Sequence, residues 1–242
     1  MSNSALTTRS EAANGYEVVS LSAADVDEIV ALYALACSGT PHGFLAIRTK
    51  NDFCQILAHP EDVIATGIRH CGRLIAYSIC HSVAKNPYPR HPALSLIDAS
   101  KSTVYHGDGT VVHPAYQGRM FAQRISRLRW RQIVERQIDH VLGLIAVDNI
   151  VSVGNAVLAG VLLVGFTRDA TSLNYIAYAG RFRDKLRTDT VPTTVGWKNH
   201  TQQQRLFREG NVVCDLTHSN DLSSAATKRE RQFSFVPWIL QG

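Results

Sequence analysis

Apolar and polar residues follow two periods along the first half of this 242-residue chain. Alternation with a period of two predicts strands, and apolar residues three or four positions apart predict helices. In chain order, the expected elements are a strand at 16–21, helices at 26–33 and 52–58, and strands at 63–68, 74–82 and 103–112. Ser22 and Asp25 have the spacing of a capping box, which predicts the start of the first helix. Residues 71–73 predict a hairpin turn between the second and third strands.

The second half begins with the longest helical pattern of the chain. It covers residues 117–137 and has Phe121, Ile125, Leu128 and Ile133 on its apolar side. The elements expected after it are a strand at 141–147 buried on both faces, a short helix at 150–159 with Gly160 as its stop, strands at 161–166 and 173–178, a helix at 201–209, and strands at 212–216 and 233–237. Helices and strands mixed in this order predict an α/β (α+β) fold.

Changes in polarity along the chain predict three parts. Residues 1–15 are polar and lack an apolar core stretch, so we expect a flexible leader and neither a signal peptide nor a membrane anchor. Residues 16–182 are expected to form one domain. Residues 183–242 are more polar, and we expect them to form an appendage of a helix and strands packed on the same domain.

Two local signals refine the expected elements. Three prolines within residues 86–92 are too stiff for a helix or a central strand, so they predict a surface loop. Gly107 and Gly109 lie within an expected strand and predict a bulge there, at a point where another group approaches the backbone closely.

The charge of the chain is mildly basic. There are 25 lysines and arginines against 20 acidic residues, a net charge of +5, which favours anionic partners. A nucleotide cofactor would satisfy this excess as well as nucleic acid would. The five cysteines are odd in number and form no C-x-x-C pair, which argues against a disulfide framework and a structural zinc site, and predicts a cytoplasmic protein without a metal.

The candidate chemistry begins at a junction between an expected strand and the long helix. Residues 111–122 read Val-Val-His-Pro-Ala-Tyr-Gln-Gly-Arg-Met-Phe-Ala, which predicts a strand end, a turn and a helix start. Backbone N–H groups without helical partners meet the positive end of the helix dipole at such a junction. The sequence therefore predicts a binding site for a phosphate or pyrophosphate group.

This junction resembles the cofactor motif of the GNAT superfamily of acyl-CoA-dependent N-acyltransferases, V-x-P-x-x-(Q/R)-x-x-G-x-(G/A). Val112, Pro114, Gln117 and Ala122 occupy motif positions, whereas Met120 stands where the central glycine usually is. The resemblance covers about residues 16–182. It implies a central mixed, mostly antiparallel sheet flanked by helices.

A second motif matches the same superfamily. Asn149-x-x-Ser152 followed by Gly160 fits the pattern N-x-x-S-x-x-x-x-x-x-x-G. Asn149 and Ser152 also suit a helix cap, and the two roles are compatible. The resemblance implies acetyl-CoA (coenzyme A) as the cofactor. The cofactor-binding residues that it implies are Val111, Val112, His113, Gln117, Gly118, Arg119, Met120, Phe121, Ala122, Asn149 and Ser152.

The implied reaction is direct attack of a primary amine on the thioester, with a base that takes the amine proton. Asp108 and His106, on the strand before the motif, are the candidate catalytic residues, and ordinary turn chemistry is the alternative for Asp108. Many members use a tyrosine as the acid, but that position is Ala156 here. The loops that set the substrate in the family correspond here to segments that contain His42, Phe44 and Tyr88, which are the candidate substrate-binding residues.

Two other functions remain open at this stage. A GNAT-fold module that binds coenzyme A without turnover would fit Met120 and Ala156. A nucleic-acid-binding protein would use the arginines of the long helix, but a solvated basic face is the favoured interpretation of those arginines because aromatic residues do not alternate with them. The expected partner is a small-molecule or protein amine, with no membrane partner, and a homodimer is left open.

Overall fold

The computed structural model describes residues 15–41, 43–85, 94, 97, 102–168, 173–180, 190–218 and 231–237. Contacts within the chain divide it into two compact units. The first unit consists of Met1–Pro89 and Lys101–Ile138, and the second of Arg90–Ser100 and Asp139–Gly242. The domain boundary expected after residue 182 stays a prediction.

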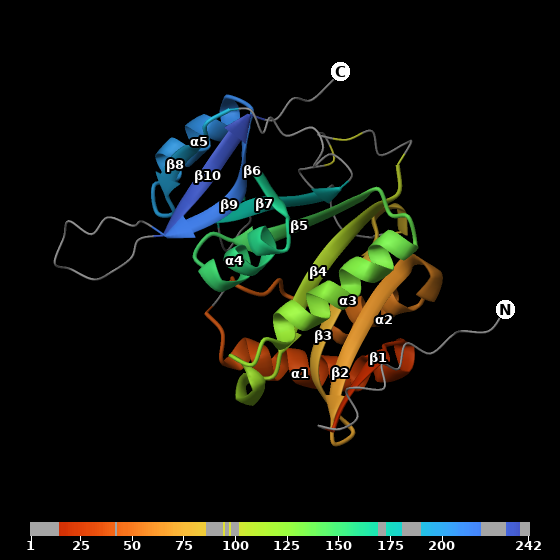
Figure 1. Cartoon of the computed structure of the whole chain (residues 1–242). Helices are drawn as coiled ribbons and strands as arrows, with labels where there is room; N and C mark the ends of the chain where they lie inside the picture. The colour runs from red at the N-terminus through yellow and green to blue at the C-terminus, as the bar shows by residue number, and fades with distance from the viewer. Residues whose placement is uncertain are drawn as a thin grey trace. The chain divides into compact units, whose positions relative to one another are not determined.

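The first unit contains four antiparallel strands that pair in chain order (Figure 1). They are β1 (Tyr16–Ser20), β2 (Val63–His70), β3 (Arg73–Ser82) and β4 (Val104–Val112). The β2–β3 turn consists of Cys71 and Gly72, which both have positive φ angles, of 49° and 75°. Such angles suit a two-residue hairpin turn, so the hairpin predicted from the sequence is confirmed.

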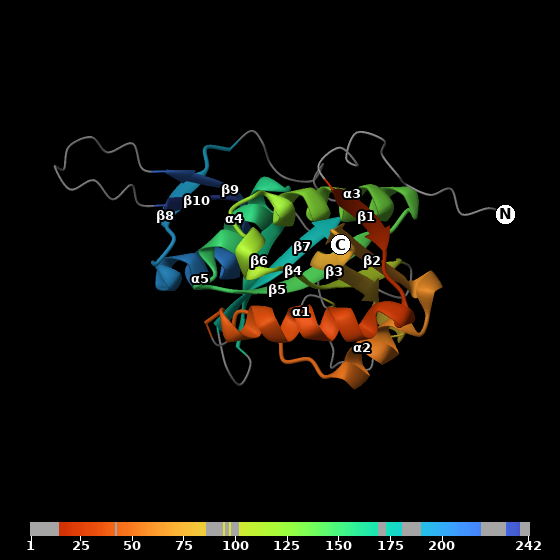
Figure 2. The same ribbon diagram turned by 90° about the horizontal axis from the view of Figure 1, so that it is seen from below.

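Three helices cover the two faces of these strands. α1 (Val26–Ser38) and α2 (Lys50–Leu57) lie on one face, and α3 (Phe121–Glu135) lies on the other (Figure 2). On the α1 and α2 face, Ile29 and Phe53 are almost fully buried in one apolar cluster. On the α3 face, Phe121 and Ile125 pack against Ile68. The strands are therefore buried from both sides. This packing holds the end of β4 and the start of α3 in place.

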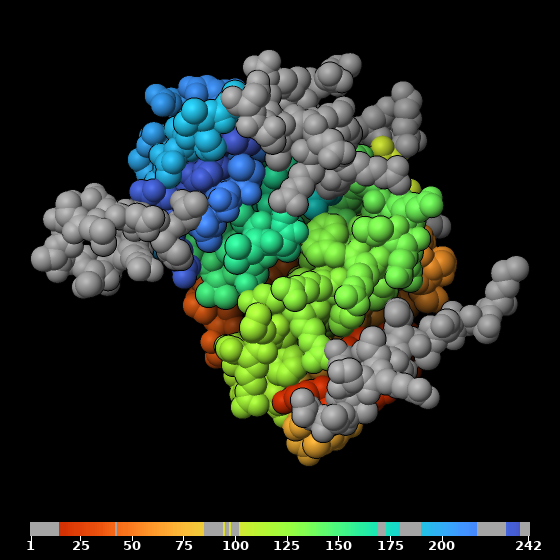
Figure 3. All heavy atoms as spheres, in the orientation of Figure 1, coloured from red at the N-terminus to blue at the C-terminus, as the bar shows by residue number. Residues whose placement is uncertain are grey.

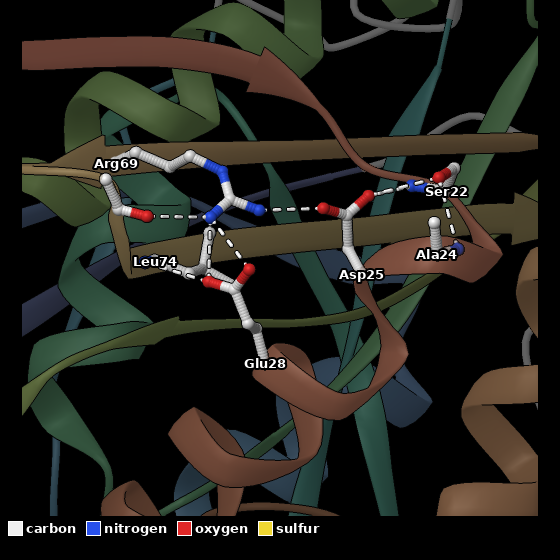
Figure 4. A network of polar contacts seen from close by, with 7 residues as sticks. Ser22, Ala24, Asp25, Glu28, Arg69 and Leu74 are labelled. Carbon is white, nitrogen blue, oxygen red and sulfur yellow. Dashed lines mark hydrogen bonds and ion pairs between the residues drawn. The ribbon is translucent and has the colours of Figure 1, made fainter.

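A network of polar contacts joins α1 to the β2–β3 hairpin (Figure 4). Ser22 and Asp25 form the predicted capping box, in which the Asp25 carboxylate accepts from the Ser22 N–H at 2.9 Å. The Arg69 guanidinium donates to Asp25 at 2.7 Å and to Glu28 at 2.7 and 2.8 Å. Glu28 also accepts from the Leu74 N–H at 3.3 Å. The first turn of α1 is thus tied to the hairpin by charge-assisted hydrogen bonds.

The second unit contains antiparallel strands in the order β5-β7-β6-β9-β10-β8. Its elements are β5 (His140–Ala146), α4 (Ile150–Leu158), β6 (Leu162–Arg168), β7 (Leu173–Gly180), β8 (Thr193–Gly196), α5 (His200–Arg208), β9 (Asn211–His218) and β10 (Arg231–Pro237). Val153 of α4, Tyr175 of β7 and Phe233 of β10 are fully buried in one apolar cluster. The C-terminal strands therefore share a core with β6 and β7.

The structure differs from the sequence predictions in three elements. The long helix begins at Phe121 rather than at residue 117, because two residues before it have positive φ angles. β5 is not buried on both faces throughout, since Leu144 is 38% exposed. β8 was not expected; it is only four residues long and alternates weakly. None of the described helices is long and apolar enough to cross a membrane.

Candidate functional site

The junction between β4 and α3 has the strand, turn and helix start that the sequence predicts. Val112 is the last residue of β4, and the His113 N–H donates to the Ile75 carbonyl at 2.8 Å. A short 3-10 turn, Pro114–Tyr116, follows. Gly118 and Met120 then have φ angles of 75° and 62°. These two left-handed residues turn the chain sharply into the first turn of α3.

The residues 117–122, which we call the 117–122 turn, are open to solvent on one side. Residues 117–120 are exposed, and α3 with this turn lies on the face of the first unit seen in Figure 3. Met120 occupies the N-cap position and makes no side-chain hydrogen bond to the helix. A Cβ added at Gly118 would meet no atom within 4 Å, so the backbone is accessible there. Arg119 adds an exposed positive charge beside the Tyr116 ring. The arrangement suits an anion with several oxygen atoms.

Met120 departs from the glycine of the motif, and its geometry explains why glycine is usual there. Its φ and ψ angles of 62° and 15° lie in the left-handed region, which glycine adopts without steric cost. The Met120 side chain is 63% exposed. The departure therefore strains the backbone without filling the 117–122 turn.

We expect Met120→Gly to raise the free energy of unfolding by about 0.5–1 kcal/mol, because relief of the left-handed strain exceeds the added entropy of the unfolded chain. Urea unfolding measures this change. Met120→Ala is the matched control: it removes the same side chain but keeps the strain. A gain from alanine as large as that from glycine would contradict the explanation.

A cluster of aromatic side chains packs beside the 117–122 turn. The Tyr116 hydroxyl lies 2.8 Å from His70 Nδ1, and the His70 ring stacks on Tyr16 at 4.6 Å between centroids. Phe121, the first residue of α3, contacts both Tyr16 and Tyr116 through its ring. The His113 ring also packs on Tyr116, at 5.5 Å. β1, β2 and the two ends of the turn are thereby joined in one cluster.

Asp108 lies at the bulge that the sequence predicts in β4. Ile79 of β3 pairs with Gly109 and Cys80 pairs with Gly107, so Asp108 is the extra residue. Its carboxylate is bound by Arg48: Nε donates to both oxygens, at 3.0 and 3.2 Å, and Nη2 makes a further ion pair. Arg48 is not predicted as a site residue from the sequence, because nothing in the connection between α1 and α2 distinguishes this arginine from a solvated one.

His106 lies in register with His81 of β3. The two imidazole rings stack in parallel, with 5.5 Å between centroids and 7° between planes. Tyr77 and Ile79 belong to the apolar cluster under α1, and His81 continues their alternation along β3. His106 therefore lies on the same face of the strands as the Arg48–Asp108 pair. The structure brings the two predicted catalytic residues to one face.

Burial lowers the pKa of His81, although the charge of Asp108 opposes this effect. A histidine with a lowered folded-state pKa contributes stability above the unfolded-state pKa of 6.5, and this stability is lost as the pH falls below that value. We expect the free energy of unfolding to fall between pH 7.5 and pH 5, and to fall less in His81→Asn. Urea unfolding at the two pH values, with exposed His59 replaced in a control variant, tests this expectation. An equal loss in wild type and His81→Asn would contradict it.

The arginines of α3 do not all form the solvated face that the sequence predicts. Arg129 donates to the fully buried Ser78 hydroxyl at 2.9 Å, and desolvation lowers the pKa of its guanidinium. Arg136 donates to the carbonyls of Glu61 and Val63, at 3.2 and 2.8 Å. The prediction is wrong for Arg129, which attaches α3 to the strands. Arg136, the C-cap residue of α3, stays exposed as predicted while it contacts Glu61 and Val63.

The second motif forms both ends of α4 in the second unit. Asn149 is the N-cap, and its side chain accepts from the Ser152 N–H at 3.2 Å. At the other end, Gly160 has a φ angle of 86°, its N–H donates to Val157, and the Val161 N–H donates to Ala156. These contacts form a Schellman motif, so the capping role and the glycine stop are confirmed. A cofactor role for Asn149 and Ser152 stays a prediction.

The remaining predicted site residues lie in several environments. Val111 is buried in the cluster under α1, and Val112 packs against the α3 side. The Gln117 N–H donates to the Pro114 carbonyl at 3.2 Å. Ala122 and Phe44 are half-buried, and His42 and Tyr88 lie outside the described residues.

Comparison with known proteins gives matches in structure alone. The sequence matches no family model and no curated protein. The ribosomal-protein-S18-alanine N-acetyltransferase of Escherichia coli has a TM-score of 0.52 and 12% identity, over 68% of this chain and 93% of that protein. The ribosomal-protein-alanine N-acetyltransferase of Brucella melitensis has a TM-score of 0.54 and 12% identity, over 67% and 98%. A putative acetyltransferase of Salmonella typhimurium, solved with its cofactor acetyl-CoA, has a TM-score of 0.50 and 14% identity, over 69% and 94%. The chain therefore has the fold of the GNAT acetyltransferases, as its two motifs predict.

Proposed function

We propose that the protein is an acyl-CoA-dependent N-acyltransferase that moves an acetyl group from acetyl-CoA to a primary amine. The observation that carries the proposal is the 117–122 turn, where left-handed Gly118 and Met120 leave an exposed helix start at the motif positions. The structural neighbours are acetyltransferases by name, and one holds acetyl-CoA. The names of these neighbours and the acetyl-CoA bound to one of them support acetyl-CoA as the anionic ligand of the turn.

The backbone of the 117–122 turn is proposed to hold the pyrophosphate of the cofactor. Its N–H groups and the dipole of α3 favour negative charge, and Arg119 adds a cation at the exposed side. The backbone of Val111 and Val112 at the end of β4, and of His113 after it, is the proposed contact of the acyl arm. A cofactor contact by Asn149 and Ser152 is proposed from the family resemblance alone. When bound, acetyl-CoA supplies the thioester carbonyl that the amine attacks.

The proton of the attacking amine requires a base on the same face of the strands. The Asp108 carboxylate already accepts several hydrogen bonds from Arg48, so both of its oxygens are occupied. His106, stacked on His81, is the better candidate, since imidazole accepts protons near neutral pH. Ala156 cannot act as an acid, so the thiolate is proposed to leave without a tyrosine at that position.

The acceptor is proposed to be a small-molecule or protein amine, and the cysteine pattern supports the cytoplasm as the compartment. Two neighbours are named for ribosomal-protein alanine, so a peptide with an N-terminal alanine belongs in any panel of acceptors. Other members of the panel are a polyamine, a lysine-containing peptide and an aromatic primary amine.

Calorimetric titration with acetyl-CoA, followed by detection of free thiol with the acceptor panel, tests the proposal. We expect binding below millimolar concentration and thiol release with at least one amine. Absence of binding at millimolar acetyl-CoA would remove the proposal. Binding without thiol release from any amine would instead favour a coenzyme A-binding module without turnover, for which the absence of a tyrosine at Ala156 is the supporting observation.

A further inference from the structure

The Arg48–Asp108 pair joins two segments that are 60 residues apart in the sequence. Arg48 lies in the connection between α1 and α2, and Asp108 lies at the bulge of β4. The two side chains are only 13% and 2% exposed. A carboxylate this well buried is stable as an ion only with a partner, so the pair constrains the position of the connection.

Tyr33 of α1 holds the same connection through its backbone. The Tyr33 hydroxyl donates to the Ala46 carbonyl at 2.5 Å and accepts from the Arg48 N–H at 3.1 Å. Burial raises the pKa of Tyr33 to about 12, so the hydroxyl keeps its proton at neutral pH. The backbone on both sides of Ile47 is therefore attached to α1, while the Ile47 side chain is 74% exposed.

The bulge determines where the Asp108 carboxylate points. Gly107 and Gly109 flank Asp108, and Gly109 has a φ angle of 117°, which glycine adopts most readily. Ser78 donates to the Gly109 carbonyl at 3.2 Å and accepts from Arg129 of α3 at 2.9 Å. The α3 side of the strands thus holds the bulge in place, and Asp108 reaches Arg48 on the opposite side.

We propose that Arg48 and Asp108 act together as a positioning pair, which holds residues 43–48 against β4 on the face that carries His106, the proposed base, and so sets the position of the acceptor amine. The positioning role rests on the proposed acetyltransferase function, because only that function requires an acceptor amine. Asp108 is in this view an anchor for the connection, and the proton of the amine goes to another group. Tyr33 supports the pair by holding the backbone of Ala46 and Arg48.

Amide hydrogen exchange of the full-length protein without cofactor tests the positioning pair directly. Arg48→Gln and Asp108→Asn are each expected to speed exchange in peptides covering residues 43–48 at least tenfold. The double variant is expected to be no faster than the faster single variant, since both changes break one contact. Tyr33→Phe keeps the ion pair, so we expect it to speed exchange in the same peptides by a smaller factor than Arg48→Gln or Asp108→Asn.

Lys50→Ala provides the matched control. Lys50 pairs with Asp27 near the same connection, but the two side chains are 62% and 83% exposed. We expect no change in exchange from Lys50→Ala, because such exposed pairs contribute little. Unchanged exchange at 43–48 in Arg48→Gln, additive effects in the double variant, or an equal increase over the whole chain would each overturn the positioning pair.

Kinetics with whichever amine of the panel turns over then tests the role in acceptor binding. Arg48→Gln and Arg48→Lys are expected to raise the KM for the amine at least tenfold and fivefold, respectively, with the Kd for acetyl-CoA within twofold of wild type. A loss confined to kcat would overturn the positioning role. Failure of acetyl-CoA to bind the wild type would contradict the proposed function but leave the exchange result intact, so the two failures are distinguishable.

Discussion

Ala122→Glu is expected to weaken acetyl-CoA binding on the order of 100-fold, which corresponds to about 2.7 kcal/mol. Ala122 is the second residue of α3, within the 117–122 turn. A carboxylate there would compete for the N–H groups of the turn and repel the phosphates. The same carboxylate interacts favourably with the helix dipole, by about 0.3–1 kcal/mol. The variant should therefore be as stable as wild type or slightly more stable, and still bind the cofactor poorly.

Calorimetry and urea unfolding measure these two effects separately. Val134→Glu is the matched control, because it adds the same charge to the same helix at a side chain that is 74% exposed. Twelve residues of helix separate it from Ala122 by about 18 Å. We expect its acetyl-CoA affinity to stay within threefold of wild type. If both variants lowered the acetyl-CoA affinity equally, the cause would be the change in net charge. If Ala122→Glu did not lower the affinity, the phosphates would bind away from the 117–122 turn.

The features of the fold that depend on neighbouring residues could be predicted from the sequence. The Ser22 and Asp25 capping box is confirmed, and so is the bulge between Gly107 and Gly109. The glycine stop at Gly160 is confirmed as well. In each case the residue types that determine the local backbone lie within a few positions of one another, so no tertiary information is needed.

The parts of the candidate site that depend on distant residues could not be predicted. The sequence gives no reason to join Arg48 to Asp108, because their contact depends on how the connection before α2 folds against β4. Arg129 looks like any other arginine of an amphipathic helix until its guanidinium is seen on Ser78. The left-handed conformation of Met120 could not be predicted from its residue type, because methionine seldom adopts it. Only its position in the motif, where glycine is usual, indicated this conformation.

Gln203→Leu is expected to lower the free energy of unfolding of the second unit by about 3 kcal/mol. Gln203 is fully buried; its side chain accepts from the Tyr175 hydroxyl at 2.8 Å and donates to the carbonyls of Gly196 and Trp197, both at 2.9 Å. Leucine would leave all three groups without this partner, and each buried group so abandoned costs about 1–3 kcal/mol. Relief from burying the amide offsets part of this cost.

Gln204→Leu is the matched control, since it makes the same change at the next residue of α5, which is exposed. We expect urea unfolding to show less than about 0.5 kcal/mol for this variant. Tyr175→Phe should cost less than Gln203→Leu, because it removes one hydrogen bond of the three and leaves the two to Gly196 and Trp197. If Gln203→Leu were as stable as Gln204→Leu, the buried amide would not be what holds β8 and α5 to β7, and apolar packing of Leu206 and Phe233 would suffice.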